Sequence, residues 1–166
     1  MPVRLPDRCG PDCIAGFRAA AMQRCADAVA LASNGRRTAA IYLWGYAVEM
    51  WLKAAYFTAF RYRGDQPITA TDLRAVIELA PSVGVAWAGR NLHHLPSWAR
   101  MLIETRQEFG LEYPTRLFSA DLIRNTNRVY LIWRETLRYH PNVAYDHEVG
   151  AVRRCVDWFR DHADSL

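Results

Sequence analysis

The chain has 166 residues, of which 51% are hydrophobic and 23% are charged, and its formal net charge is +4. These values exclude disordered, collagen-like and mucin-like proteins. They suit one domain over residues 1–166, with a core from about residue 12 to residue 164 and an N-terminal extension over residues 1–11. The basic residues, among which Lys53 is the only lysine, are spread along the chain, so the composition alone does not assign a nucleic-acid binder.

The N-terminal segment favours a reduced, cytoplasmic protein. Residues 1–12 contain prolines and charged side chains instead of the apolar run of a secretory signal. The spacing of Cys9 and Cys13 matches neither a redox pair nor half of a zinc site, so we expect no metal and no cofactor. We expect Cys25 and Cys155 to be small side chains of the core.

The first half of the chain predicts two long helices. The first is capped by Asp12 and ends near Gly35. The second spans about residues 36–61 and is apolar around most of its circumference, so we expect it at the centre of the fold. Its length would suit a membrane span, but Glu49 and Lys53 would be costly near the centre of a bilayer. A buried helix of a soluble protein is therefore expected.

The second half of the chain predicts shorter helices whose ends are marked by capping residues and prolines. Ser119 caps a long helix that continues to Pro141, and the last helix has apolar residues at three- and four-residue spacing over 145–163. The other expected boundaries are a capping box of Thr69 and Asp72, an interruption at Pro81, and a first helical turn at Pro96. No segment alternates like a strand. The sequence thus predicts an all-α, up-and-down bundle of about five to six helices.

Glu49 and Lys53 are candidate site residues, because they are opposite charges four residues apart on an apolar helix. Such charges must be neutralised by each other, by solvent or by a further partner. Tyr46 lies on the same side of the helix. One interpretation is a local ion pair at the edge of the bundle. The other is a polar recess that also meets an arginine of the long fifth helix and contacts a phosphate or a base. Gly45, nearby, is expected to let a neighbouring helix approach closely.

Basic and aromatic residues gather between residues 116 and 140. Arg124 and Arg128 share one flank of the expected helix, and Tyr130 and Tyr139 lie among the arginines. This combination suits single-stranded nucleic acid, through neutralisation of phosphates and stacking of bases. A solvated flank of a core helix has the same pattern, so the sequence leaves both interpretations open.

The adjacent histidines His93 and His94 have no carboxylate or cysteine close by in the sequence. A role in capping a helix or anchoring a loop is therefore favoured over metal binding. The chain contains no glycine-rich phosphate loop, nucleophile elbow or H-E-x-x-H motif. This excludes the common hydrolase and nucleotide-binding motifs.

Three segments resemble the HEPN-domain family, which consists of helical proteins of prokaryotes. Residues 40–54 are similar to the family's GYAxExxLKA helix. The segment from His94 to Leu102 is similar to the HxLxxL start of the next core helix, and residues 133–139 are similar to a W…LRY segment. The three segments cover about residues 40–140 in the order that the family has.

The resemblance implies a helical bundle that pairs as a homodimer and has an RNA-related role. Some members belong to toxin–antitoxin systems and associate with a nucleotidyltransferase-like protein. Nuclease members share an R-x4-6-H motif, in which the histidine assists attack by the 2′-hydroxyl without a metal and the arginine steadies the phosphate. Arg134 and His140 match that motif, and the resemblance therefore implies them as a catalytic pair.

Three functions stay open at this point. The first is a dimeric module without catalysis that binds RNA, a nucleotide or a protein partner. The second is a metal-independent endoribonuclease that uses Arg134 and His140. The third is a structural adaptor whose exposed Trp51 and Trp87 form an interface. The ligand-binding residues expected for the first function are Glu49, Lys53, Tyr46, Arg138, Tyr139 and His94.

Overall fold

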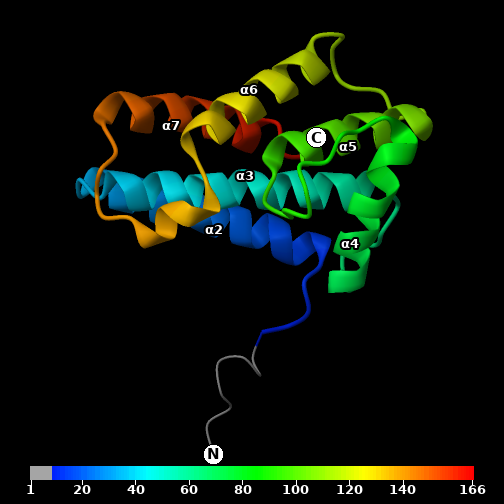
Figure 1. Cartoon of the computed structure of the whole chain (residues 1–166), viewed down its shortest axis with the longest axis horizontal. Coiled ribbons are helices and arrows are strands. Elements are labelled where there is room, and N and C mark those ends of the chain that lie inside the picture. Colours follow the sequence, from blue (N-terminus) through cyan, green and yellow to red (C-terminus); the bar gives the residue numbers. More distant parts are fainter. Residues whose placement is uncertain (1–8) are drawn as a thin grey trace, which may run out of the picture.

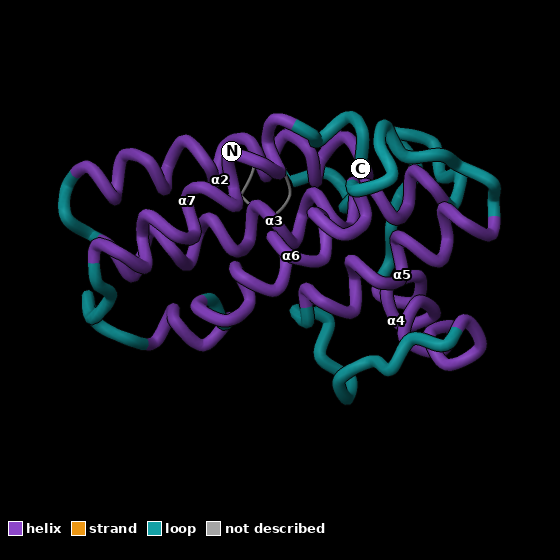
Figure 2. Tube along the Cα trace, turned by 90° about the horizontal axis from the view of Figure 1, so that it is seen from above, coloured by secondary structure: helices purple, strands orange, loops and turns teal. Residues whose placement is uncertain are grey.

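Six α-helices and two short 3-10 helices make up the computed structural model of the chain, which describes residues 9–166. The all-α prediction is confirmed, and no strand occurs in the described residues (Figures 1 and 2). The elements are α2 (Ile14–Ser33), α3 (Arg37–Ala59), α4 (Ala70–Leu79), η1 (Ala80–Val83), α5 (Leu95–Glu108), α6 (Phe118–Ile132), η2 (Glu135–Tyr139) and α7 (Asp146–Asp161). Most of the expected N-terminal extension, residues 1–11, lies outside the described residues.

Helix α3 lies at the centre of the bundle, as its apolar circumference predicts. It packs against α2 on one side and against α5 and α7 on the other (Figure 1). Trp44, Val48 and Leu52 are among its many fully buried side chains. Transfer of such side chains from water is the main favourable term in folding, so α3 forms the core on which the other helices are arranged.

The helix ends follow local capping chemistry. Thr69 and Asp72 form the expected capping box at the start of α4. The expectation for α2 was wrong by one residue, because the Sγ of Cys13, and not the side chain of Asp12, accepts the N–H of Gly16. The helix is interrupted near Pro81, as predicted: α4 ends at Leu79, the 3-10 helix η1 follows over Ala80–Val83, and Gly84 then has a positive φ of 75°.

Helix α6 differs most from the prediction. Ser119 does not cap it, since the N-cap is Leu117, which makes no side-chain bond. The helix ends at Ile132 and does not continue to Pro141, because Trp133 is extended, with φ −91° and ψ 139°. The indole of Trp133 is fully buried, and its N–H donates to the carbonyl of Tyr42 at 3.0 Å. The ring is thus buried with its polar group satisfied, which is usual for a buried tryptophan.

Gly45 makes the insertion of Trp133 possible. A Cβ built on Gly45 would lie 2.1 Å from the ring of Trp133, a distance at which atoms clash. The residue in contact with Gly45 is therefore a tryptophan from the chain after α6, and not the neighbouring helix that the sequence predicted. This contact attaches the segment with η2 to the start of α3.

Two of the four cysteines lie in the hydrophobic core. Cys25 and Cys155 are buried free thiols, as predicted. Burial raises the pKa of Cys25 to about 12, so its thiol stays protonated at neutral pH. In the part of the chain that the structure describes, no helix is both long enough and apolar enough to cross a membrane.

Replacing Gly45 by alanine tests the contact with Trp133. We expect Gly45→Ala to lower the free energy of unfolding by about 1–3 kcal/mol, the usual cost of overpacking a core. The measurement is urea denaturation. Gly150→Ala is the matched control, since Gly150 is also helical but its Cβ would meet only the end of the Arg154 side chain, at 3.5 Å. Equal stability of the two variants would contradict this account.

Candidate functional site

Four polar side chains follow one face of α3. Tyr42, Tyr46, Glu49 and Lys53 are spaced by four, three and four residues, and such spacing places side chains along one side of a helix. The ring of Tyr46 contacts the rings of Tyr42, His93 and Trp133, with centroids 4.9, 5.7 and 5.5 Å away. These contacts join the row on α3 to the loop before α5 and to the segment after α6.

Glu49 and Lys53 form a buried ion pair near the middle of this row. Their exposed fractions are only 3% and 7%, and the Nζ of Lys53 lies 2.5 Å from the Oε1 of Glu49. The interpretation as a pair at the edge of the bundle is therefore wrong. The other interpretation, a polar recess, required a third partner for the pair, and the structure has one. That partner is His93, whose Nδ1 lies 2.9 Å from the Oε2 of Glu49, and not an arginine of the fifth helix.

Both members of the buried ion pair have further partners within the protein. The Nζ of Lys53 also lies 5.5 Å from the centre of the Trp98 ring, a favourable cation–π position. Both carboxylate oxygens of Glu49 are within 3.1 Å of the Nδ1 of His93. The role that follows for Glu49 and Lys53 is to hold the loop before α5 against α3, while His93, which is partly exposed, faces outward.

His94 caps helix α5, as the sequence analysis favoured. Its Nδ1 accepts the backbone N–H of Ser97 at 3.2 Å and lies 2.6 Å from the hydroxyl of Ser97. Burial, and next the positive charges of Arg134 and Arg100, lower the pKa of His94 below its ordinary value of 6.5. The imidazole therefore stays neutral, which the acceptor role of Nδ1 requires.

The structure does not bring Arg134 and His140 together as a pair. The guanidinium of Arg134 stacks 3.8 Å from the centre of the Tyr130 ring and donates to the carbonyl of Trp133. His140 is exposed and lies beyond η2, beside Arg138 and Asn142. Arg134 directly precedes η2, and His140 directly follows it.

A cavity of about 280 Å³ lies between the start of α3, η2 and the loop that follows η2. We call it the arginine–tyrosine cavity. Its lining residues are Arg36, Thr38, Ala39, Tyr42, Leu137, Arg138, His140, Pro141 and Asn142. Among the predicted ligand-binding residues, Arg138 lines this cavity. Tyr139, the next residue of η2, is not one of the lining residues.

The charges of the arginine–tyrosine cavity are positive and uncompensated. Arg36 and Arg138 are exposed, and neither has a carboxylate partner among the described residues. Arg138 lies 4.7 Å from the centre of the Tyr139 ring, which is 72% exposed. Hydrogen bonding to Tyr139 and, less strongly, to Tyr42 raises the pKa of Arg138 further above its ordinary value. The cavity thus presents two cations and the half-buried ring of Tyr42, and the exposed ring of Tyr139 lies beside it against Arg138.

Tyr46 connects the buried pair to the arginine–tyrosine cavity. Burial raises its pKa, and its hydrogen bond with Tyr42 and the charge of Glu49 act in the same direction. The phenol therefore stays protonated and orients Tyr42, which lines the cavity. The predicted residues Tyr46, Glu49 and Lys53 lie further along the same face of α3 and do not line the cavity.

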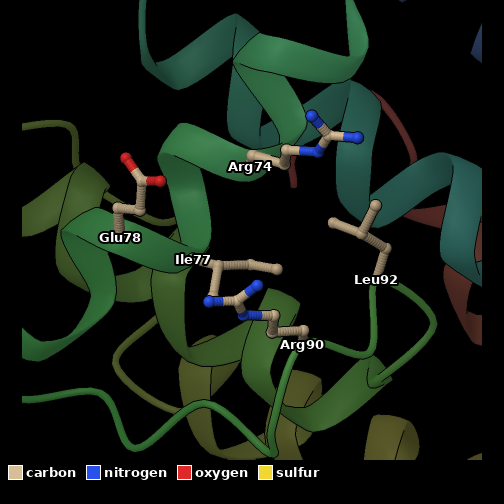
Figure 3. A pocket seen from close by; sticks show the side chains of 5 residues that line it. All are labelled: Arg74, Ile77, Glu78, Arg90 and Leu92. Atoms are coloured by element: carbon tan, nitrogen blue, oxygen red, sulfur yellow. The ribbon is translucent and has the colours of Figure 1, made fainter.

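A second cavity, of about 240 Å³, lies between α4 and the loop before α5. Arg74 and Arg90 reach it from these two segments, with Ile77 and Leu92 between them (Figure 3). Glu78 also lines this cavity and offsets part of its positive charge. No aromatic ring lines it, so it suits a stacked base less well than the arginine–tyrosine cavity does.

Comparison with known proteins finds no match: no family model, no curated protein and no solved structure is significantly similar to this chain. The resemblance to the HEPN-domain family therefore rests on the three sequence segments and stays a prediction.

Glu49→Gln tests the buried pair. The amide keeps the shape of the side chain but leaves the ammonium group of Lys53 buried without a counter-charge, which costs about 3–5 kcal/mol. We expect this loss in the free energy of unfolding, measured by urea denaturation. The double variant with Glu49→Gln and Lys53→Met should regain much of it, because the uncompensated charge is gone. A double variant less stable than Glu49→Gln would refute this description.

The cap at His94 predicts a dependence of stability on pH. Because the pKa of His94 is lower in the folded chain than in the unfolded one, the unfolded chain binds more protons below about pH 6.5. Stability is therefore lost as the pH falls through 6.5. His94→Asn keeps a capping oxygen without this titration, so its free energy of unfolding should fall less steeply with acid. The control is His147→Asn at an exposed histidine, and equal slopes in the two variants would disprove the effect.

Proposed function

We propose that this protein binds single-stranded RNA through the arginine–tyrosine cavity. The observation that carries the proposal is the placing of two unpaired arginines, Arg36 and Arg138, beside the rings of Tyr42 and Tyr139. Guanidinium groups bind phosphates through planar pairs of N–H groups. Exposed aromatic rings stack on bases, with about 1–3 kcal/mol for each base. A nucleotide strand carries phosphates and bases at close spacing, so it can contact the arginines and the tyrosines together.

The buried network supports this function indirectly. The side chains of Glu49, Lys53 and His93 tie the loop before α5 to the face of α3 that also carries Tyr42 and Tyr46. Trp133 fixes the segment leading to η2 on the same face. The cations and rings of the cavity are thus attached to rigid elements, and a preorganised surface loses less entropy on binding.

The geometry favours binding over cleavage. Arg134 stacks on Tyr130, whereas His140 lines the arginine–tyrosine cavity, so these contacts lend the metal-independent endoribonuclease no support. The adaptor hypothesis is weakened because Trp51, expected at an exposed interface, is only 2% exposed. The resemblance to the HEPN-domain family supports an RNA-related role. The homodimer, the toxin–antitoxin role and the nucleotidyltransferase-like partner that it implies are part of the proposal, as is the cytoplasmic location that the N-terminal segment favours. Light scattering tests the homodimer.

Fluorescence anisotropy with a labelled single-stranded RNA tests the cavity. We expect Arg36→Ala and Arg138→Ala each to weaken binding and to lower the slope of log affinity against log salt by about 0.7, the value for one phosphate contact on a single strand. Tyr139→Ala should weaken binding by about 1–3 kcal/mol through lost stacking. Arg153→Ala is the control, since Arg153 is exposed on α7 and lies 4.0 Å from its own partner, Asp157.

Two further measurements separate the alternatives. Competition by a free mononucleotide at concentrations that displace the RNA would show that a nucleotide, and not a strand, is the ligand. RNA cleavage in the presence of EDTA that is lost in His140→Ala would favour the endoribonuclease. Binding that is unchanged in Arg36→Ala, Arg138→Ala and Tyr139→Ala would overturn the proposal.

A further inference from the structure

A smaller cavity lies next to the arginine–tyrosine cavity. A cavity of about 140 Å³ lies over α3, next to the start of α7, and it shares Thr38 and Leu137 with the arginine–tyrosine cavity. Thr38 of α3 and Leu137 of η2 each line both hollows, and the backbone N–H groups of Val143 and Ala144 donate to the Oγ1 of Thr38 between them. We call this smaller hollow the middle cavity.

A third hollow extends the same path between α6 and α7. It measures about 400 Å³ and shares Ile132 with the middle cavity. Its lining residues are Asn125, Arg128, Leu131, Ile132, Ala151, Arg154 and Cys155. We call it the α6–α7 cavity. The three hollows therefore follow one another from η2, past the end of α6, to the middle of α7, along elements that lie side by side (Figure 1).

The far end of this path is positively charged, like the near end. Arg128 on α6 and Arg154 on α7 are exposed and have no carboxylate partner in the described part of the chain. Their neighbours differ in this respect, since Arg124 lies 2.6 Å from Asp121 and Arg153 lies 4.0 Å from Asp157. Arg128 of α6 and Arg154 of α7 both line this hollow, so its two walls each contribute a cation.

The middle of the path is mainly apolar and aromatic. Val143 and Tyr145, which line the middle cavity, are 59% and 67% exposed. Glu148 is the one carboxylate among the residues that line the three hollows. Its Oε2 accepts the backbone N–H of Tyr145 at 2.8 Å in the capping box of α7, where the positive end of the helix dipole offsets its charge. Repulsion of a phosphate by Glu148 is thereby reduced.

We propose that the three hollows form one groove that binds a single RNA strand along its length. Arg36 and Arg138 contact phosphates at one end, Arg128 and Arg154 contact phosphates at the other, and Tyr145 stacks on a base between them. The inference rests on the proposed function and adds a second contact site and a path between the two. Alternation of cationic and aromatic groups along a groove is what binding of a strand without sequence preference requires.

The experiment compares RNA strands of about 4 and about 12 nucleotides, lengths that span the range of common single-strand sites. Affinity is measured by anisotropy for the natural chain, for the double variant Arg128→Ala with Arg154→Ala, and for Arg153→Ala as the control. We expect the natural chain to bind the longer strand more tightly. The double variant should lose about tenfold in affinity for the longer strand, and its salt slope should fall by about 0.7 for each lost phosphate contact. Binding of the shorter strand should not change.

The outcomes distinguish the groove from the cavity that it extends. If both strands bind with equal affinity, and Arg138→Ala weakens both equally, the cavity binds RNA but the groove does not exist. If Arg138→Ala weakens neither strand, the proposed function itself fails. A loss in Arg153→Ala as large as that in the double variant would assign the effect to net charge and reject the groove. Circular dichroism shows whether each variant is folded.

Discussion

The contact between Trp133 and Gly45 is the interaction on which the rest of the structure depends. The indole of Trp133 donates to the carbonyl of Tyr42, and the chain leaves the helical path at this same residue, whose backbone is extended. The chain then returns as η2 along the start of α3. Arg138 and Tyr139 consequently lie next to Tyr42, and a cavity forms where an unbroken helix would have left a solvated flank.

Charge is divided between the inside of the protein and its surface in a consistent way. The buried carboxylate of Glu49 has two partners, Lys53 and His93, so its desolvation is compensated locally. The surface arginines at the cavity and in the groove have no such partners among the described residues. Buried ions of this kind stabilise an arrangement of segments, whereas unpaired surface ions attract a ligand of opposite charge. The unpaired surface arginines, and not the buried ions, therefore account for the proposed function.

The sequence predicted the features that depend on local patterns. Helix α3 was predictable because apolar residues surround it, and the start of α4 because Thr69 and Asp72 are three residues apart. The end of α6 was not predictable, since Val129, Trp133 and Leu137 continue a helical period and the competing partner, Tyr42, is distant in the sequence. His93 was missed as a site residue for the same reason, because 44 residues separate it from Glu49. The only signal in the sequence was that His93 and His94 are adjacent.

The most direct test of the central claim is a map of the binding surface in solution. Backbone amide chemical shifts, followed by NMR while single-stranded RNA is added, report which segments contact the strand. The account predicts that the largest changes occur at Arg36, Tyr42, Arg138 and Tyr139. Changes concentrated at Arg74 and Arg90, around the cavity between α4 and the loop before α5, would contradict it.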